Sequence, residues 1–306
     1  MQKITPFLWF DNQAEDAVNF YCSVFKNAKK KGVARYDEEG AKASGRPKGS
    51  VMTAAFEIED HEFVALNGGP VFKINPSISF FANSKIESEV IELYDKLSAG
   101  GTVLMPLDKY PFSDKYAWVQ DKYGVSWQLI LSMGEIKQRI VPSMMFVGKV
   151  CGKAEEAINF YTSIFSAGPG GKNSKIGNIF RYGANQGPDK EGTIAFADFE
   201  LNGEWFAAMD SAHEHNFTFT EALSFVVNCE TQEEVDYYWK KLVEGGQESV
   251  CGWLKDKFGL SWQVVPVVLS KFLSDRDPKK SQRVMHAMLQ MKKIDIPALE
   301  KAYNQQ

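Results

Sequence analysis

Apolar residues recur at helical spacing in two stretches of the chain that resemble each other closely. Residues 14–25, AEDAVNFYCSVF, and residues 154–165, AEEAINFYTSIF, are identical at eight of twelve positions. In both stretches the apolar residues follow the spacing i, i+3, i+4 and i+7, which places them on one face of a helix. The pattern therefore predicts two amphipathic helices that each pack one face against a core.

A second pair of matching stretches combines a strand pattern with a helix pattern. Residues 78–101 and residues 223–246 each begin as a short apolar strand, continue as a helix and end at two adjacent glycines, which suit a helix C-cap. Alternating apolar residues predict hairpins at residues 48–68 and at residues 190–210. Each hairpin lies between the two helices of its own repeat.

The matched blocks occur in the same order twice, so the chain contains an internal duplication. We place the two halves at residues 1–135 and 139–270, each made of two βαβββ units. The halves differ mainly at one hairpin, which is long at residues 102–120 and short at residues 247–255. We therefore expect two similar domains built from four units.

Residues 271–306 follow the duplication and belong to neither half. Val284, Met285, Met288 and Met291 are spaced along one face of a helix, and Pro297 suits the first turn of a second helix. We expect a helical tail that covers apolar surface of this chain or of a partner.

Composition excludes several classes of protein. The 306 residues are 44% hydrophobic and 24% charged, as in folded globular proteins, and the formal net charge of -4 argues against a general nucleic-acid binder. No apolar run approaches the ~20 residues of a membrane-spanning helix, and the N-terminus does not resemble a secretory signal. The four cysteines lack paired spacing, which is typical of reduced thiols. We expect a cytoplasmic protein that binds neither nucleic acid nor membranes.

The last strand of each half carries the same turn and strand, DKYGVSWQLI at 121–130 and DKFGLSWQVV at 256–265. Because side chains alternate along a strand, Trp127 and Trp262 should pack beneath helices while Gln128 and Gln263 face a cleft. Each glutamine either binds a ligand or is a polar residue whose hydrogen bonds are satisfied within the protein.

The same alternation on the first strand places Phe7 and Trp9 on one face and Leu8 and Phe10 on the other. If the second face meets the helices, the first lines the cleft, where Tyr116 and Trp118 join it from the long hairpin. By alignment, Cys251 and Trp253 take the corresponding places in the second half. Aromatic walls with a few polar groups are typical of small-molecule pockets. Alternatively, these aromatic side chains are buried against the other domain or the tail.

These motifs, together with ITPFLWFD, FVALNGGP and CGWLKDKFGLSWQVVP, resemble the PhnB-like branch of the vicinal oxygen chelate superfamily, also called the glyoxalase/bleomycin-resistance superfamily. Members of this branch are often labelled 3-demethylubiquinone-9 3-methyltransferase. The resemblance covers nearly the whole chain. It implies an α+β fold of two tandem domains, each with two βαβββ units in a curved eight-stranded sheet, helices on one side and a ligand cleft on the other.

The resemblance also implies where a metal would bind, because superfamily enzymes hold one with His and Glu side chains in the cleft. The implied positions fall on or near Thr5, Asn67, Ser77 and Gln128 in the first half, and on or near Val141, Asp210, Ala222 and Gln263 in the second. Apart from Asp210 these residues are neutral, whereas divalent cations prefer anionic or imidazole ligands. We therefore expect no metal at these positions, and no cofactor.

Other candidate chemistry is weaker. By its alignment with Tyr116, Cys251 is expected to point into a cleft; no histidine base is apparent beside it, and a small core residue is the alternative. His213 and His215 flank Glu214 in what we expect to be a loop near Asp210, and a loop-borne metal site of His and Asp side chains is the alternative to a plain connecting loop. We expect His61 and His286 at the surface. The glycine-rich stretch 166–177 follows a helix, so it is a loop and not the nucleotide-binding turn that a methyltransferase needs.

Three functions remain consistent with the sequence. The first, which we favour, is a metal-independent protein that binds a small aromatic or amphipathic molecule through Phe7, Trp9, Asn67, Tyr116, Trp118, Gln128, Asp210, Cys251, Trp253 and Gln263. The second is a superfamily enzyme of the lyase, isomerase or dioxygenase type with an atypical metal site. The third is a structural or regulatory module whose clefts are filled by its own side chains. The duplication implies that pairing between modules is satisfied within one chain, and leaves a homodimer of whole chains open.

Overall fold

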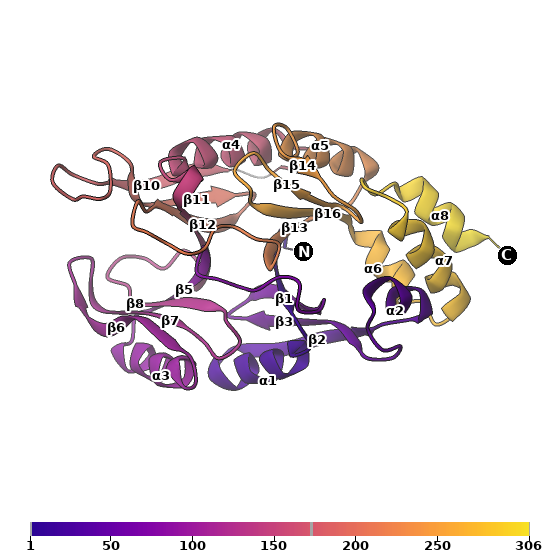
Figure 1. Cartoon of the computed structure of the whole chain (residues 1–306), viewed down its shortest axis with the longest axis horizontal. Coiled ribbons are helices and arrows are strands. Elements are labelled where there is room, and N and C mark those ends of the chain that lie inside the picture. Colours follow the sequence, from indigo (N-terminus) through magenta and orange to yellow (C-terminus); the bar gives the residue numbers. More distant parts are fainter. Residues whose placement is uncertain (1, 172–173, 306) are drawn as a thin grey trace.

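The computed structural model describes residues 2–171 and 174–305. Its strands form two eight-stranded sheets, here called sheet A and sheet B (Figure 1). Sheet A contains β1 (Ile4–Phe10), β2 (Ala28–Arg35), β3 (Val51–Ile58), β4 (His61–Asn67), β13 (Leu223–Cys229), β14 (Gln247–Glu248), β15 (Trp253–Lys255) and β16 (Ser261–Pro266). Sheet B contains β5 (Ile78–Ser84), β6 (Thr102–Tyr110), β7 (Ser113–Gln120), β8 (Ser126–Leu131), β9 (Ile140–Phe146), β10 (Lys175–Arg181), β11 (Ile194–Leu201) and β12 (Glu204–Asp210).

The four βαβββ units and the two eight-stranded sheets agree with the α+β fold expected from the sequence. The expectation that each half forms its own sheet is wrong, because each sheet combines one unit from each half. Sheet A runs β14-β15-β16-β13-β1-β4-β3-β2 and joins the first unit of the first half to the last unit of the second. Sheet B joins the two remaining units through β5 and β9. The halves at 1–135 and 139–270 are thus repeats in sequence that share both sheets.

Units of different halves can share a sheet because the first strand of each unit forms the same kind of edge. β1 pairs antiparallel with β13 of the other half, and β5 pairs with β9 in the same manner. An ion pair fastens each exchanged edge, from Lys3 to Glu234 at 2.8 Å and from Arg139 to Glu89 at 2.6 Å. The two pairs occupy matching places in the repeat, so a basic residue and a glutamate at equivalent positions connect the strands at both crossings.

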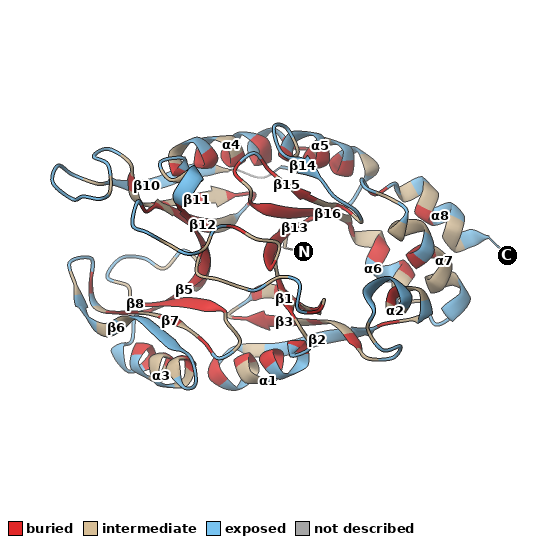
Figure 2. Cartoon of the chain, viewed as in Figure 1, coloured by how far each residue is buried: buried red, intermediate tan, exposed pale blue. Residues whose placement is uncertain are grey.

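The two long helices of each half lie in one layer, although the strands of that half are divided between sheets A and B. In Figure 1, α1 (Ala14–Val24) and α3 (Glu87–Ser98) form one layer below the sheets, and α4 (Ala154–Ala167) and α5 (Gln232–Leu242) form another above them. The main hydrophobic core lies between these helices and the sheets. The sheet faces that pack against the helices are called inner faces below, and the opposite faces are called outer faces. Figure 2 shows buried residues concentrated on the strands and on the inward sides of the helices.

The predicted tryptophans pack in this core. Trp127 and Trp262 are almost fully buried, and each indole Nε1 donates a hydrogen bond of 2.9 Å to an aspartate at the start of its own motif, Asp121 or Asp256. Each aspartate also accepts a hydrogen bond from a helix tyrosine, Tyr21 on α1 or Tyr161 on α4. The repeated turn and strand therefore fastens α1 to β8 and α4 to β16.

The tail forms the predicted helices α7 (Pro278–Leu289) and α8 (Ile296–Asn304), preceded by α6 (Val267–Leu273). They enclose a small apolar cluster of their own around Phe272 and Val284, with Val265 of β16 packed against it. α7 also lies beside α2 (Glu38–Ser44) of the first half (Figure 1). The tail therefore covers surface of its own chain.

The glycine-rich stretch follows α4 and leads into β10, as expected of a loop, although Lys172 and Asn173 within it lie outside the described residues. No helix among the residues described is both long enough and apolar enough to cross a membrane.

Candidate functional site

Two aromatic residues of β1 point away from the core, as alternation predicts. Leu8 and Phe10 are buried on the inner face, whereas Phe7 and Trp9 lie on the outer face of sheet A. Their rings meet Trp253 of β15, with centroid separations of 5.8 Å and 6.2 Å. The aromatic wall is therefore shared between the two halves.

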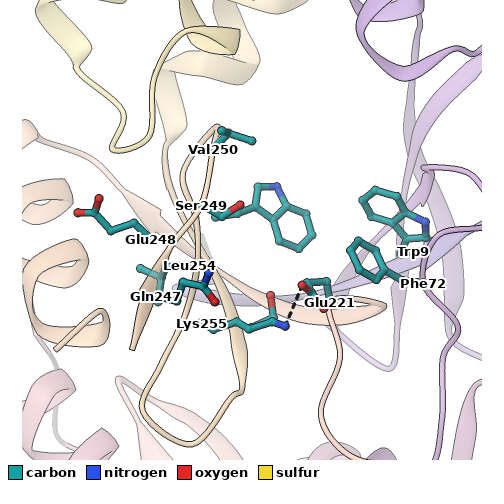
Figure 3. Close-up of a pocket in the computed structure, with 11 residues that line it drawn as sticks. Trp9, Phe72, Glu221, Gln247, Glu248, Ser249, Val250, Leu254 and Lys255 are labelled. Atoms are coloured by element: carbon teal, nitrogen blue, oxygen red, sulfur yellow. Dashed lines mark ion pairs between the residues drawn. The ribbon is translucent and has the colours of Figure 1, made fainter. Parts of the chain in front are cut away.

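A pocket of about 270 Å³ opens beside this wall (Figure 3). It lies between β1, the linker after β4 and the short β14–β15 hairpin. The lining residues are Trp9, Phe72, Glu221, Gln247, Glu248, Ser249, Val250, Trp253, Leu254, Lys255 and Ser261. Both halves contribute, because Trp9 and Phe72 come from the first and the others from the second.

The linker after β4 holds Trp9 in place. The indole Nε1 of Trp9 donates a hydrogen bond of 2.8 Å to the carbonyl of Gly69, and its ring meets the edge of Phe72 at 5.0 Å. A Cβ at Gly68 would lie only 2.2 Å from the Trp9 ring, so the chain can pass this close only as glycine. The glycines of FVALNGGP thus shape one side of the pocket.

Polar groups face this aromatic wall from β15 and β16. Lys255 and Ser261 are directly opposite each other in the antiparallel ladder, so their side chains share the outer face. The Lys255 ammonium contacts the Glu221 carboxylate at 2.9 Å (Figure 3). Ser261 is 1% exposed, and its hydroxyl has no hydrogen-bond partner among the described residues. The hydroxyl oxygen is itself buried, so it lies beneath the surface of the pocket.

Gln263 lies next to the pocket and not in its lining. Its Nε2 donates a hydrogen bond of 3.0 Å to the Ser224 hydroxyl, and it sits opposite Trp253 in the ladder. The glutamine faces outward, as the alternation predicted. It therefore lies beside Trp253 on the outer face of sheet A.

The corresponding glutamine on sheet B is covered by its own neighbours. The Tyr116 hydroxyl donates a hydrogen bond of 2.6 Å to Oε1 of Gln128, whose Nε2 donates to Ser79 at 2.8 Å. Burial raises the pKa of Tyr116, so the phenol keeps its proton and acts as the donor. Trp118 donates a hydrogen bond of 2.7 Å from its indole to the Ser126 hydroxyl.

An apolar cluster fills the outer face of sheet B around this network. It contains Phe81, Tyr116 and Ala207, with Met105, Tyr110, Trp118, Ile130, Val141, Phe196 and Met209 packed against them. The residues predicted from the first half are thus divided between the sheets. Phe7 and Trp9 face sheet A's pocket, whereas Tyr116, Trp118 and Gln128 lie in sheet B's cluster, so the expected single cleft for Phe7 and Gln128 is wrong.

Asn67 and Asp210 cap helices and do not line the pocket. The Asn67 Oδ1 accepts a hydrogen bond of 2.8 Å from the Ala14 amide at the start of α1. The Asp210 Oδ1 accepts hydrogen bonds from the amides of Gly152 and Ala154 at 2.7 and 3.1 Å, where α4 begins. Burial raises the pKa of Asp210, and these backbone donors oppose the shift. Both side chains are committed to helix starts.

Cys251 does not face a cleft. It occupies a left-handed turn with φ of 57° just before β15, and its thiol contacts the Met288 carbonyl of the tail at 3.7 Å. Burial raises the pKa of this thiol, which disfavours the thiolate that nucleophilic chemistry requires. The position aligned with Tyr116 has left the strand because this hairpin is shorter.

The histidines are dispersed. His213 lies 3.6 Å from Asp189, and His215 contacts the Ser211 hydroxyl at 2.8 Å. Within residues 2–171 and 174–305, no group of three or more His, Cys, Asp or Glu side chains is arranged to hold a metal ion. His61 is 3% exposed, so its predicted surface position is wrong. It is buried because β4 begins where the two halves meet.

The positions implied for metal ligands do not suit a divalent cation. The Thr5 hydroxyl accepts a hydrogen bond of 3.0 Å from Asn228, and Gln263 and Gln128 bond to serines. Val141 offers no donor atom at all. Neutral hydroxyl and amide groups already bonded to one another are poor replacements for carboxylate and imidazole.

Residues 2–130 and residues 138–265 each match the model of a protein family described as 3-demethylubiquinone-9 3-methyltransferase. The two matched segments correspond to the two repeats. The family domain therefore occurs twice in tandem. No curated protein matches the chain.

The chain is also similar to proteins of known structure. The PhnB protein of Bacillus cereus is 41% identical, over 43% of this chain and 100% of that one, with a TM-score of 0.39. Glyoxalase I of Zea mays is 12% identical over 86% of this chain and 91% of that one, with a TM-score of 0.54. The second likeness is one of fold.

Proposed function

This chain belongs to the family described as 3-demethylubiquinone-9 3-methyltransferase, in the glyoxalase-like vicinal oxygen chelate superfamily, and on that premise we propose that it binds a small molecule in the pocket beside Trp253. The ligand is aromatic or amphipathic, with an apolar part against the aromatic wall. A divalent metal at the superfamily positions has no part in this binding.

The observation that carries the proposal is the aromatic wall of the pocket. Trp9, Phe72 and Trp253 line the pocket, and the Gly69 carbonyl holds the indole of Trp9 in place. Aromatic walls with a few polar groups are typical of small-molecule pockets, and here the lining includes the charged side chains of Lys255 and Glu221.

The methyl transfer in the family's description is not part of the proposal. The glycine-rich stretch runs from α4 to β10, so it follows a helix and lacks the strand-to-helix context of a nucleotide-binding turn. Fold alone does not fix activity. The pocket supports binding without assigning a reaction.

The test is a fluorescence titration with N-phenyl-1-naphthylamine, a neutral aromatic probe whose emission rises in apolar surroundings. We expect saturable binding that Trp253→Ala weakens at least fivefold. Trp118→Ala is the matched control, because Trp118 holds the equivalent place on sheet B and should leave the affinity unchanged. Equal affinity in the wild type and Trp253→Ala would refute the proposed pocket.

A further inference from the structure

We propose that the helical tail positions the wall of the pocket from outside, because it holds the β14–β15 hairpin that carries Trp253, and that ligand binding and docking of the tail stabilise each other. This rests on the proposed function, since it concerns the regulation of the same pocket. The contacts between the tail and this hairpin supply the argument.

The β14–β15 hairpin forms most of the pocket but has little support from its own sheet. Residues 247–255 supply seven of the eleven residues that line the pocket. β14 has two residues and lies at the edge of sheet A, where it pairs only with β15, which has three. The corresponding hairpin on sheet B is much longer, with nine residues in β6 and eight in β7. A hairpin with so few ladder bonds needs support from elsewhere in the chain.

The tail supplies this support at the two residues that precede Trp253. The Cys251 amide donates a hydrogen bond of 2.8 Å to the Met291 carbonyl. The Gly252 amide donates a hydrogen bond of 2.7 Å to the Lys292 carbonyl. The backbone from which the Trp253 side chain extends is therefore held by the turn between α7 and α8.

Gly252 is enclosed by β16 on one side and by the tail on the other. Its carbonyl accepts a hydrogen bond of 2.8 Å from the Val264 amide of β16. Its φ of 84° is a left-handed conformation that favours glycine. A Cβ at this position would lie 2.8 Å from the Val264 carbonyl oxygen and 3.3 Å from Cγ1 of Ile294 in the tail. The hairpin and the tail therefore interlock, and a shift of one displaces the other.

The part of the tail that touches the hairpin belongs to the tail's small core. Ile294 is fully buried in the apolar cluster that also contains Val284. Lys292, two residues earlier, contacts Glu248 in the pocket lining at 3.3 Å, but these side chains are 65% and 45% exposed, so the ion pair contributes little. The backbone hydrogen bonds and the packing of Ile294 therefore carry the connection.

Docking of the tail and binding of a ligand are linked through this connection. The tail packs an apolar cluster of its own beside the main core, so it can separate while the two sheets stay intact. A hairpin released in this way no longer holds Trp253 against Phe7 and Trp9, and the pocket loses part of its wall. Because coupling between two equilibria is reciprocal, a ligand strengthens docking of the tail by the factor by which docking strengthens ligand binding.

The first measurement is the affinity for N-phenyl-1-naphthylamine. Val284→Asp disrupts the core of the tail and lies outside the pocket lining, and we expect it to weaken binding at least fivefold. Lys279→Asp places the same charge at an exposed position of α7 and should bind the probe like the wild type. Unchanged affinity in Val284→Asp, alongside weaker binding in Trp253→Ala, would overturn the coupling and leave the pocket.

The second measurement uses the wild-type chain, so it does not depend on the folding of a variant. Saturating N-phenyl-1-naphthylamine should slow tryptic cleavage between residues 271 and 293 at least fivefold. Cleavage after Lys190, in the exposed loop between β10 and β11, is the internal control and should keep its rate. In Trp253→Ala the same concentration of probe should have a smaller effect on the tail.

The outcomes separate this inference from the proposed function. Saturable binding to the wild type that leaves cleavage of the tail unchanged overturns the coupling and keeps the pocket. Equal slowing at Lys190 and in the tail has the same consequence, because it shows a general effect on cleavage. Absence of N-phenyl-1-naphthylamine binding to the wild type overturns both proposals.

Discussion

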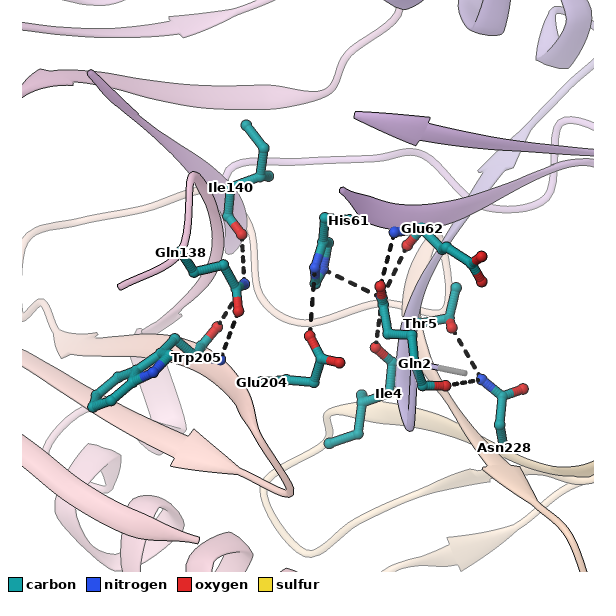
Figure 4. A network of polar contacts seen from close by, with 10 residues as sticks. All are labelled: Gln2, Ile4, Thr5, His61, Glu62, Gln138, Ile140, Glu204, Trp205 and Asn228. Carbon is teal, nitrogen blue, oxygen red and sulfur yellow. Dashed lines mark hydrogen bonds and ion pairs between the residues drawn. The ribbon is translucent and has the colours of Figure 1, made fainter. Parts of the chain in front are cut away.

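His61 and Glu204 stand at matching positions in the two repeats, and their side chains meet where the halves join, with Nδ1 and Oε2 3.5 Å apart (Figure 4). His61 opens β4 and Glu204 opens β12, so each residue contacts its own counterpart. The duplicated strand thus carries a basic residue in one copy and an acidic residue in the other, a difference that two identical modules could not have.

A pair of glutamines brackets this contact symmetrically. Gln2 donates from Nε2 to the Ile4 carbonyl at 2.9 Å, and Gln138 donates to the Ile140 carbonyl at 2.6 Å. The Gln2 Oε1 accepts from the Glu62 amide, just as the Gln138 Oε1 accepts from the amide of Trp205. Figure 4 shows the two glutamines on either side of His61 and Glu204. The same local bonds recur in both repeats.

Burial of His61 predicts an acid-sensitive fold. Burial lowers the pKa of His61 to about 4, and the nearby Glu204 carboxylate does not compensate for the loss of water. Between pH 6.5 and 4 the unfolded chain therefore binds a proton that the folded chain does not, so the free energy of unfolding falls as the pH falls. The full effect is about 3 kcal/mol.

Urea unfolding of His61→Gln across this pH range measures that contribution. The variant should lose stability more slowly than the wild type as the pH falls, whereas His286→Gln, on the exposed side of α7, should follow the wild type. The pH dependence of the variant must be compared with that of the wild type, because other groups also titrate in this range. Burial raises the pKa of Asp256 to about 6, and this carboxyl changes the free energy of unfolding in the opposite direction. Parallel curves for His61→Gln and the wild type would contradict the prediction.

The matched serines should differ in their effect on stability. Ser126→Ala removes the acceptor of the Trp118 indole and should cost about 1 kcal/mol. Ser261→Ala removes a buried hydroxyl that has no partner among the residues described, so it should be neutral or stabilising. Chemical denaturation of both variants without ligand provides the measurement, and equal losses would show that Ser261 has a partner in solution.

Exchange of units between the sheets predicts that a single half cannot be complete alone. In a chain of residues 1–135, β1 lacks β13 and β5 lacks β9. Unpaired edges of this kind favour association, and two copies can pair β1 of one with β5 of the other. Light scattering should give twice the mass of the half, and a folded monomer would contradict the prediction.

The tail should detach when its small core is disrupted. Val284 is fully buried in the cluster formed by α6 to α8, so Val284→Asp places a charge where no partner exists among the cluster's apolar residues. We expect faster tryptic cleavage between residues 271 and 293 in this variant. Lys279→Arg, exposed on the same helix and still a trypsin site, is the control and should be cleaved like the wild type.

Only one of the two outer faces should take up ligand. Tyr116 and its neighbours fill the outer face of sheet B, whereas the pocket of about 270 Å³ lies on sheet A. Native mass spectrometry should therefore detect one N-phenyl-1-naphthylamine per chain at saturation. Two tightly bound molecules would show that the apolar cluster on sheet B opens.

Much of the site was visible in the alternation of individual strands. The outward directions of Phe7, Trp9, Gln128 and Gln263 follow from the period of two, and the structure agrees with each. The alternation could not show that Asn67 and Asp210 cap helices, because the start of a helix is positioned by a strand distant in sequence. Nor did it point to Ser261 or Lys255, although both share the face of Trp253.

The sequence by itself determined the four βαβββ units, their duplication, the helical tail and the outward faces of β1, β8 and β16, since these depend on local periodicity. Only the tertiary structure decided which units share a sheet, because the unit edges are alike and periodicity does not name a partner. It also decided that the Ser126 hydroxyl accepts a hydrogen bond from Trp118, whereas the Ser261 hydroxyl has no partner among the described residues. The two serines lie in the same motif, which cannot show that the indole of Trp253 packs against Phe7 and Trp9 of β1.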